Sequence, residues 1–480
     1  MKVMTFPSPA YRPSTVHTAL GTAFFDVVQP ARFPQHTLRY RNQRWAEAVG
    51  LGHLSEEEWL AHFGRFAPLP DNLPQPLALR YHGHQFRSYN PEIGDGRGFL
   101  FAQLVDDEGR LLDLGTKGSG QTPYSRFGDG RLTLKGGVRE VLATALLEAF
   151  GVYTSKSFSL IETGEELVRG DEPSPTRSSV LVRLSHSHVR FGTFQRCLAY
   201  NDQAGIAALV AHCVRHYHPG AARGGEVAKE APALLAAVTR ACGAMVGEWM
   251  AAGFVHGVLN TDNMVVTGES FDYGPWRFLP RYDPGFTAAY FDQTGLYAFG
   301  RQPGAVAWNL ERFAECLTLV APVADLEDAL RTYAAAFHAG LRRALCARLG
   351  MAEAGAEADD ELAAAFFQFL LKSGALFERT LFDWHGGIGR RSFAMSGPQA
   401  SLYQGAEFAR LEAAIGAREP LPQPPEAAAY FDGEGPATLL IEEVEALWAP
   451  IAERDDWSHF HGTLDRIELA RKAHALRPGR

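Results

Sequence analysis

The chain has 480 residues, with 46 lysines and arginines against 55 aspartates and glutamates, and a formal net charge of −9. This acidic balance argues against a general nucleic-acid-binding protein and against a basic membrane anchor. Hydrophobic residues make up 46% of the chain, which is ordinary for a globular protein and ample for a large core.

The five cysteines are scattered, and no two of them form a Cys-x-x-Cys pair. An odd number of scattered cysteines indicates reduced thiols, so we expect a cytoplasmic protein. Residues 1–7 lack the long apolar run of a signal peptide, and no window approaches the roughly 18 apolar residues of a membrane span. We therefore expect neither feature.

Residues 1–75 are punctuated by proline and are predicted to form an N-terminal extension without chemistry of its own. One helix is expected from Ser55 to Phe63, because Ser55 and Glu58 have the spacing of a capping box.

A glycine-rich segment, Gly94 to Gly98, leads into two predicted strands at 99–105 and 111–117, joined by an acidic turn. Glycines let backbone amides approach a phosphate closely, although a hairpin turn is the commoner explanation of such a cluster. Lys117 ends the second strand. A strand lysine that faces a pocket holds phosphate in kinase folds; an edge-strand lysine that prevents aggregation is the alternative.

A second Gly-Asp-Gly-Arg sequence spans residues 128–131, so the two copies flank Lys117. Turns alone do not explain this repeat, and we expect both copies to line one anion site. Val138 to Phe150 has a helical period, with Glu140 off the apolar stripe in the predicted first turn. A kinase fold needs a helical glutamate to pair with the strand lysine, whereas interaction with the helix dipole is the alternative role.

Residues 180–184 are predicted to form a strand that carries Arg183, and a polar turn separates this strand from Arg190. Arginine binds phosphate through paired hydrogen bonds and always carries charge. Two arginines here indicate an unusual phosphate position, with surface ion pairing as the alternative. His212 and His216 have a spacing compatible with zinc, but no carboxylate follows in the zinc-protease pattern, so we expect a solvated helix end.

Apolar residues with helical spacing continue to Gly253, and a polar loop follows. We predict that residues 264–266 form a strand with a turn at Gly268, which places Asp262, Asn263 and Asp272 at the edges of a small hairpin. Two carboxylates and an amide supply the oxygen ligands that Mg²⁺ prefers. A purely structural polar turn is the alternative.

Protein kinases have the same order: a catalytic loop with a metal-binding asparagine, then a metal-binding aspartate. Counting back from Asn263, the position of the kinase base falls on Val258, which accepts no proton. The carboxylate is instead at Asp262. The loop therefore has the metal ligands of a kinase without the kinase base in its usual place.

The rest of the chain is predicted to be mainly helical. Alanine-rich helical sequence fills residues 305–414, a proline-rich linker spans 421–425, and an acidic helix at 439–447 precedes a polar tail.

These motifs resemble the selenoprotein O family, the YdiU-type protein adenylyltransferases, between about residues 80 and 310. The matching sequences are Gly-His-Gln-Phe at 83–86, Gly-Asp-Gly-Arg at 94–97 and 128–131, Lys117-Gly118, Thr-Pro-Tyr-Ser-Arg at 122–126, Arg139-Glu140, Ser-His-Val-Arg-Phe-Gly at 187–192, His-Gly-Val at 256–258, Asn-Thr-Asp-Asn-Met at 260–264, Asp-Tyr-Gly-Pro at 272–275, and the stretch from Tyr297 to Leu310.

The resemblance implies an α+β, protein-kinase-like two-lobed fold with an N-terminal extension (1–75), an N-lobe (76–198), a helical C-lobe (199–420) and a linker with a helical tail (421–480). It implies that ATP binds in an orientation flipped relative to kinases, with Mg²⁺ or Mn²⁺. AMP would then be transferred to Ser, Thr or Tyr hydroxyls of proteins, including the enzyme itself. No nucleic-acid or membrane partner is expected.

The resemblance also implies a role for each candidate residue. It implies that Lys117, Arg183 and Arg190 contact the phosphates and that Glu140 pairs with Lys117. Asn263 and Asp272 would bind the metal, and Asp262 would accept the proton. The nucleotide site would be lined by Gly94, Gly96, Arg97, Asp129 and Gly130.

Two features depart from the family pattern. Arg87 stands where the family usually has the last glycine of Gly-His-Gln-Phe-Gly, and residues 476–480 lack the cysteine or selenocysteine motif of many members. Redox control through such a tail is therefore not expected. The alternatives to AMP transfer are a protein or small-molecule kinase and a catalytically silent ATP-binding pseudokinase. The joint presence of Lys117, Glu140 and the two metal ligands disfavours the pseudokinase.

Overall fold

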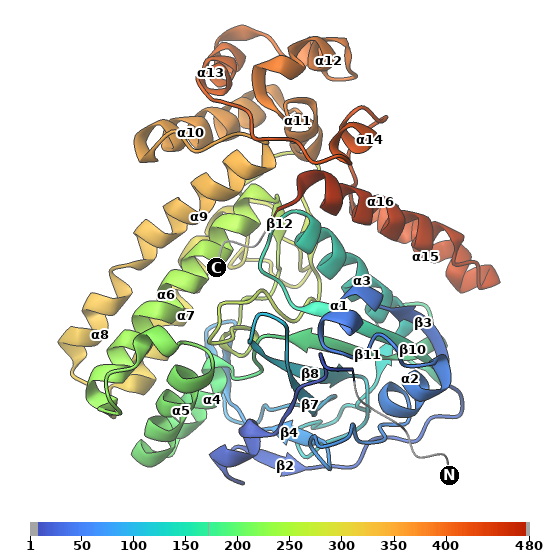
Figure 1. The fold of residues 1–480 in the computed structure, drawn as a ribbon, viewed down its shortest axis with the longest axis vertical. Helices are drawn as coiled ribbons and strands as arrows, with labels where there is room; N and C mark the ends of the chain where they lie inside the picture. The colour runs from blue at the N-terminus through green and yellow to red at the C-terminus, as the bar shows by residue number, and fades with distance from the viewer. Residues whose placement is uncertain (1–7, 171, 477–480) are drawn as a thin grey trace.

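The computed structural model describes residues 8–170 and 172–476, and it combines one large antiparallel sheet with an extensive helical part (Figure 1). The mixed α and β composition agrees with the expected class. The sheet runs in the order β2 (Phe25–Val27), β4 (Leu77–Leu79), β7 (Leu100–Val105), β8 (Leu111–Lys117), β11 (Thr176–Ser185), β10 (Lys156–Leu167) and β3 (Thr37–Arg41), with β1 (Pro13–Ser14) beside β7 and β9 (Leu132–Thr133) beside β11.

Both faces of this sheet are covered, which is why its central strands are buried at almost every position. Side chains alternate between the faces of a strand. Leu181 belongs to the core formed with α3 (Leu134–Ala149), whereas Val180 and Val182 belong to a second core with Trp59 of α2 (Glu56–Phe63). The sheet and α3 together form the frame from which the site residues project.

In the N-terminal part, the structure contains the one helix predicted there and also elements that were not predicted. Helix α2 has the predicted capping box: the Glu58 amide donates to Ser55 Oγ (3.3 Å), and the Ser55 amide donates to Glu58 Oε2 (2.9 Å). The sequence did not predict that β2 and β3 would pair with β4 and β10 of the same sheet, nor the short helix α1 (Gln43–Ala48).

Helices fill the other part of the molecule, and α6 packs lengthwise along α9 (Figure 1). Their bounds are α4 (Phe191–Ala199), α5 (Gln203–His216), α6 (Val227–Ala251), α7 (Gln302–Leu317), α8 (Val323–Leu330), α9 (Tyr333–Arg348), α10 (Ala356–Ser373), α11 (Phe377–Asp383), α12 (Arg391–Ser396), α13 (Gly405–Gly416), α14 (Ala427–Phe431), α15 (Ile441–Arg454) and α16 (Ser458–His474). Short strands pair as β5 (Gly83–Gln85) with β6 (Ser88–Asn90) and as β12 (Phe254–Val255) with β13 (Arg277–Phe278).

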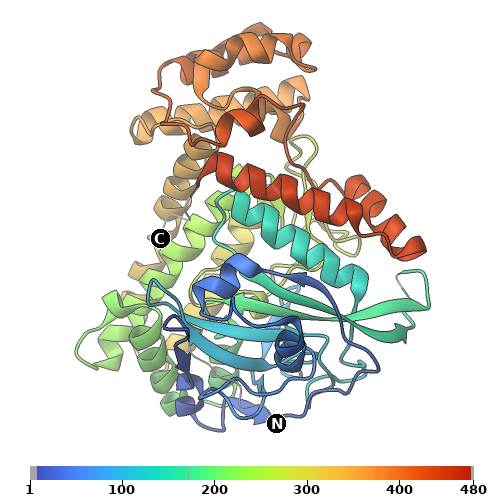
Figure 2. The same cartoon turned by 45° about the vertical axis from the view of Figure 1, so that its right-hand side comes forward.

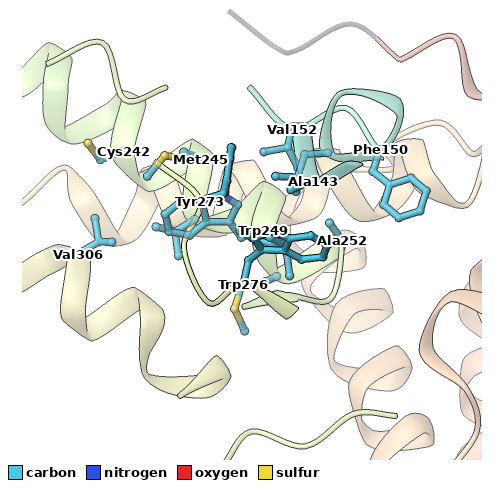
Figure 3. Packing of buried hydrophobic residues seen from close by; sticks show 14 of the residues in the cluster. Ala143, Phe150, Val152, Cys242, Met245, Trp249, Ala252, Tyr273, Trp276 and Val306 are labelled. Carbon is cyan, nitrogen blue, oxygen red and sulfur yellow. The ribbon is translucent and has the colours of Figure 1, made fainter. Parts of the chain in front are cut away.

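The end of α6 anchors the segment that follows the polar loop (Figure 3). Trp249 is buried, and its indole N–H donates to Ser270 Oγ at 2.9 Å. The Tyr273 hydroxyl donates to the same oxygen at 2.7 Å, and Trp276 is buried in the same core. Residues on both sides of Asp272 are therefore fixed by packing.

The C-terminal tail contains a long helix, since residues 458–474 form α16. This helix lies along α3, where the two views agree that it covers the outer side of that helix (Figure 2). It buries a narrow stripe that includes Phe460, Ile467 and Ala470, and its other faces are charged or polar. Most residues of this helix are polar, so its apolar stripe is narrow.

Several smaller expectations can be compared directly. His212 is buried and packs against His17, with ring centroids 6.1 Å apart, so the expected solvated helix end is wrong for this residue. All five cysteines lie within the described residues, where each is buried and none forms a disulfide. No described helix is long and apolar enough to span a bilayer. Residues 1–7 and 477–480, which bear on the signal-peptide and tail predictions, lie outside the described residues.

Candidate active site

A cleft of about 630 Å³ opens where the sheet meets the polar loop before Asp272. It brings together ten of the twelve candidate residues, and only Glu140 and Asn263 do not line it. The ten are Gly94, Gly96, Arg97, Lys117, Asp129, Gly130, Arg183, Arg190, Asp262 and Asp272.

Lys117 is held at the floor of this cleft by the sheet. It ends β8, where it pairs with Leu181 of β11, and Arg183 lies two residues further along that neighbouring strand. Residues in this diagonal relation point to the same face of a sheet. Lys117 and Arg183 therefore project together, and each contacts Asp272 Oδ1, at 2.9 Å from the lysine Nζ and 3.1 Å from the arginine.

Lys117 also forms a buried ion pair with Glu140, which holds the ammonium group from the side of α3. The side chains of the two residues are only 6% and 1% exposed. Helix α3 begins at Leu134, after the Thr133 N-cap, so Glu140 lies in the second turn and not in the predicted first. The alternative in which Glu140 only complements the helix dipole does not explain this contact.

Arg190 reaches the site from the N-terminal end of α4 and links both sides of the cleft. Its guanidinium group donates to the backbone oxygen of Asp262 (2.7 Å) and lies 3.6 Å from Asp272 Oδ2 and 3.5 Å from Asp95 Oδ1. The last contact was not predicted, because Asp95 was noted only as part of a glycine-rich turn.

The Phe271 ring packs against the guanidinium groups of both arginines. Its ring centroid lies 4.4 Å from the guanidinium carbon of Arg183 and 4.7 Å from that of Arg190. Cation–π contacts of this kind are strongest where water is excluded, and all three side chains are buried. Phe271 was not predicted as a site residue; its only signal was its place immediately before Asp272.

The two aspartates differ in charge state because their neighbours differ. Burial alone would raise the pKa of Asp272, but Lys117, Arg183 and Arg190 lower it well below its usual range. Burial raises the pKa of Asp262 to about 6, although Arg190 opposes the shift. Oδ1 of Asp262 is buried and has no hydrogen-bond partner among the described residues, although the residue itself lines the cleft.

Asp272 also has an unusual backbone. Its φ of 61° is in the left-handed region, which costs a residue other than glycine about 1–3 kcal/mol and persists only where the surroundings impose it. The packing of Phe271 and Tyr273 on either side imposes it here. The strained backbone turns the Asp272 carboxylate toward the three cations.

The predicted strand at 264–266 is wrong. Met264, Val265 and Val266 are all buried, but they make only an isolated bridge between Val265 and Arg190. Asp262 and Asn263 lie in a short 3-10 helix, Thr261–Asn263, and not at the edge of a hairpin. The Asn263 amide donates to the Val258 carbonyl (3.0 Å), which fixes the side chain on the loop outside the set that lines the cleft.

Both Gly-Asp-Gly-Arg repeats line this one cleft. A Cβ atom on Gly98 would lie 2.0 Å from the Thr116 oxygen, and one on Gly130 would lie 2.2 Å from the Gly120 carbonyl carbon. A side chain would therefore not fit at either of these two positions. The loops are also tied together, because Thr122 Oγ1 donates to the Asp95 oxygen at 2.5 Å.

The residues present fit a divalent cation by their chemistry. Asp272 offers a carboxylate, and the Asn263 amide nitrogen is already bound, so its oxygen remains the free end. Such oxygen donors suit Mg²⁺ or Mn²⁺. Among the described residues, no group of three or more His, Cys, Asp or Glu side chains forms a closed metal site. A cation here would need ligands from a bound phosphate, as is common for Mg²⁺.

The cleft thus combines buried cations and carboxylates with two glycine-rich loops, a combination suited to a phosphorylated, multiply charged ligand. The model of the family described as "Protein adenylyltransferase SelO" matches residues 8–407. The chain belongs to this family.

Bacterial proteins named protein nucleotidyltransferase YdiU are similar to this chain over most of its length. The protein nucleotidyltransferase YdiU of Gloeobacter violaceus is 43% identical over 475 residues, covering 95% of this chain and 94% of that protein. The protein of the same name from Synechocystis is 42% identical over 466 residues, with 94% and 96% covered. The one from Vibrio cholerae is 38% identical over 366 residues, with 76% and 72% covered.

Proposed function

We propose that this protein transfers AMP from ATP to Ser, Thr or Tyr hydroxyls of proteins and releases pyrophosphate. The observation that carries the proposal is the convergence of Lys117, Arg183 and Arg190 on Asp272, with the unpaired oxygen of Asp262 in the same cleft. Membership in the adenylyltransferase family supports the reaction class. We place the activity in the cytoplasm, where cysteines that form no disulfide, as these five, stay reduced.

In this proposal the molecule has the two-lobed plan of a protein kinase. Residues 76–198 provide the first lobe, with the lysine–glutamate pair between a strand and a helix, and 199–420 provide the helical second lobe. The flanking parts, 1–75 and 421–480, add strands to the sheet and helices against α3.

Lys117, Arg183 and Arg190 bind the phosphates of ATP, and Glu140 keeps Lys117 in position. Their charges now face Asp272, and a triphosphate would offer them more negative charge at the same place. The backbone of the glycine-rich loops, which line the same cleft, can approach the phosphates closely. Asp272 and Asn263 would hold a divalent cation, which would neutralise charge that builds up on the phosphates.

The position of the cations favours the α phosphorus as the reacting atom. Arg183 and Arg190 place fixed positive charge deep in the cleft, where a kinase would hold the neutral adenine end of its nucleotide. A triphosphate that points inward puts the α phosphorus near the polar loop. Val258 accepts no proton, so a hydroxyl that reacts here depends on Asp262.

In the proposed step, one bond to the α phosphorus forms as another breaks. The acceptor oxygen attacks the α phosphorus, its proton passes to the Asp262 carboxylate, and the bond from the α phosphorus to the bridging oxygen breaks. Pyrophosphate leaves with that oxygen. A carboxylate whose pKa burial raises to about 6 is suited to hold this proton. Positioning and charge remain the larger contribution in such reactions.

The products of the reaction test the proposal against its alternatives. Incubation with ATP, divalent cation and a protein mixture should release pyrophosphate, and acceptor proteins should gain the mass of AMP in intact-mass spectra. ADP with a gain of one phosphate would identify a kinase. Tight ATP binding with neither product would identify a pseudokinase.

A further inference from the structure

A patch of exposed aromatic side chains lies beside the polar loop and takes no part in the proposed chemistry. We name it the acceptor surface and define it as the exposed Phe86, Arg87, Tyr290 and Phe291 together with the half-buried Trp308. Phe86, Phe291 and Tyr290 are 38%, 46% and 81% exposed. The Phe291 ring centroid lies 5.7 Å from that of Phe86 and 5.1 Å from that of Tyr290, so these rings form one continuous cluster.

Hydrogen bonds fasten this cluster to the loop that carries Asp262. The Phe86 amide donates to Asn260 Oδ1 (3.0 Å), and the buried Tyr297 hydroxyl donates to the same oxygen (2.9 Å). The Phe86 and Tyr297 rings are also in contact, with centroids 5.0 Å apart. One asparagine, two residues before Asp262, therefore fixes the acceptor surface in register with the proposed proton acceptor.

The acceptor surface is also continuous with the cleft. Gln85 directly precedes Phe86, and it lines the cleft together with Asp262. The amide of the preceding residue, His84, donates to Thr261 Oγ1 at 2.7 Å. A polypeptide that brings a hydroxyl to Asp262 along this side would lie across Phe86 and Phe291.

Arg87 gives the acceptor surface a charge that the family pattern does not have. The family usually has glycine at this position, and Arg87 keeps a left-handed φ of 63°, which glycine adopts without strain. Its guanidinium group lies 5.4 Å from the Trp308 ring centroid. Within the described part of the chain, no carboxylate forms an ion pair with Arg87, so its charge is free for a partner.

We propose that the acceptor surface docks the segment of the protein substrate that carries the acceptor hydroxyl, and that this segment has an apolar side chain followed by an acidic one. The apolar side chain packs against Phe86 and Phe291, and the acidic one pairs with Arg87. This inference rests on the proposed function for the identity of the reaction, and on the contacts of the acceptor surface for the binding.

Peptide binding tests the docking without any need for catalysis. The probes are two fluorescent peptides with a central serine: one carries leucine and glutamate beside the serine, and its twin has lysine in place of glutamate. Fluorescence anisotropy gives their affinities for the full-length protein in the presence of ATP and Mg²⁺. Wild type should bind the glutamate peptide more tightly than the lysine twin, by about threefold for one exposed charge pair.

Two variants should change this binding, and two controls should not. Phe291→Ser should weaken the glutamate peptide about tenfold, as expected for a central aromatic contact. Arg87→Glu should reverse the preference between the peptides. Leu371→Ser on α10, which replaces a side chain 48% exposed, and Arg454→Glu on α15, 64% exposed, are matched controls away from this surface. Unchanged ATP affinity shows that each variant is folded.

Equal affinities of both peptides for wild type, Phe291→Ser and Arg87→Glu would overturn the inference. So would loss of self-association in Phe291→Ser with peptide binding unchanged, because a second copy would then be the occupant. The same peptides, incubated with ATP labelled at the α phosphate, separate the two proposals. Predicted binding without transfer refutes only AMP transfer, and transfer that is equal in all variants refutes only the docking surface.

Discussion

Replacing Lys117 by methionine tests the floor of the cleft, because it removes the charge and keeps most of the side-chain volume. The lysine contacts Glu140 and Asp272, but the two carboxylates would be affected differently. Asp272 keeps Arg183 at 3.1 Å and Arg190 at 3.6 Å. Glu140 is 1% exposed, and its other oxygen already has no partner among the described residues.

The stability cost should therefore arise at Glu140. Breaking a buried ion pair by removing one partner costs about 3–5 kcal/mol, mostly through the charge left behind. In Lys117→Met we expect the free energy of unfolding to fall by an amount in this range. The double variant Lys117→Met/Glu140→Gln leaves no uncompensated charge, so most of the lost stability should return.

Activity should behave differently from stability. Loss of one charged contact to the reacting phosphates costs about 100- to 1,000-fold in rate. The double variant should remain as inactive as Lys117→Met, because Glu140 acts only through the lysine. Urea unfolding and transfer of α-labelled AMP measure the two quantities. Recovery of activity together with stability in the double variant would refute the role given to Lys117.

Three further predictions concern the same cleft. In Asp272→Asn, asparagine can adopt the left-handed backbone but has no carboxylate. AMP transfer should therefore fall about 100-fold, while the circular dichroism spectrum stays unchanged. Transfer at the wild-type rate would exclude Asp272 as a ligand. Chelation of divalent cations should weaken ATP binding in calorimetry, because the cation would no longer offset the negative charge that the triphosphate brings beside Asp262 and Asp272, and equal affinity after chelation would contradict the metal assignment. Phe127 lines the cleft and is fully exposed, which suits its ring to stacking on adenine. Phe127→Ala should then weaken the binding of ATP by up to about tenfold. An unchanged Kd for ATP would show that adenine lies elsewhere.

The sequence predicted the parts of the site whose signal is local. Lys117 ends a run of apolar strand residues, and Glu140 lies on a helix with clear periodicity, so both could be assigned before their contact was known. The repeated Gly-Asp-Gly-Arg indicated one cleft, which the structure confirms as a shared location.

Features that depend on distant contacts could not be predicted. Asp95 and Arg190 are 95 residues apart in the sequence, and only the folded chain brings their side chains within 3.5 Å of each other. The apolar sequence at 264–266 resembles that of a strand. These three residues are apolar because they are buried, and not because they pair within a sheet. Arg87 was visible as a departure from the family pattern, but its place on an aromatic surface required the structure.

The central claim is that the α phosphorus of ATP reacts, and two parallel incubations test it most directly. The protein and a broad protein mixture are incubated with Mg²⁺ and ATP labelled either at the α or at the γ phosphate, with Lys117→Met as the inactive control. The account predicts that the α label becomes attached to protein, that the γ label appears in pyrophosphate, and that the control transfers neither. Attachment of the γ label without the α label would contradict the account and identify the protein as a kinase.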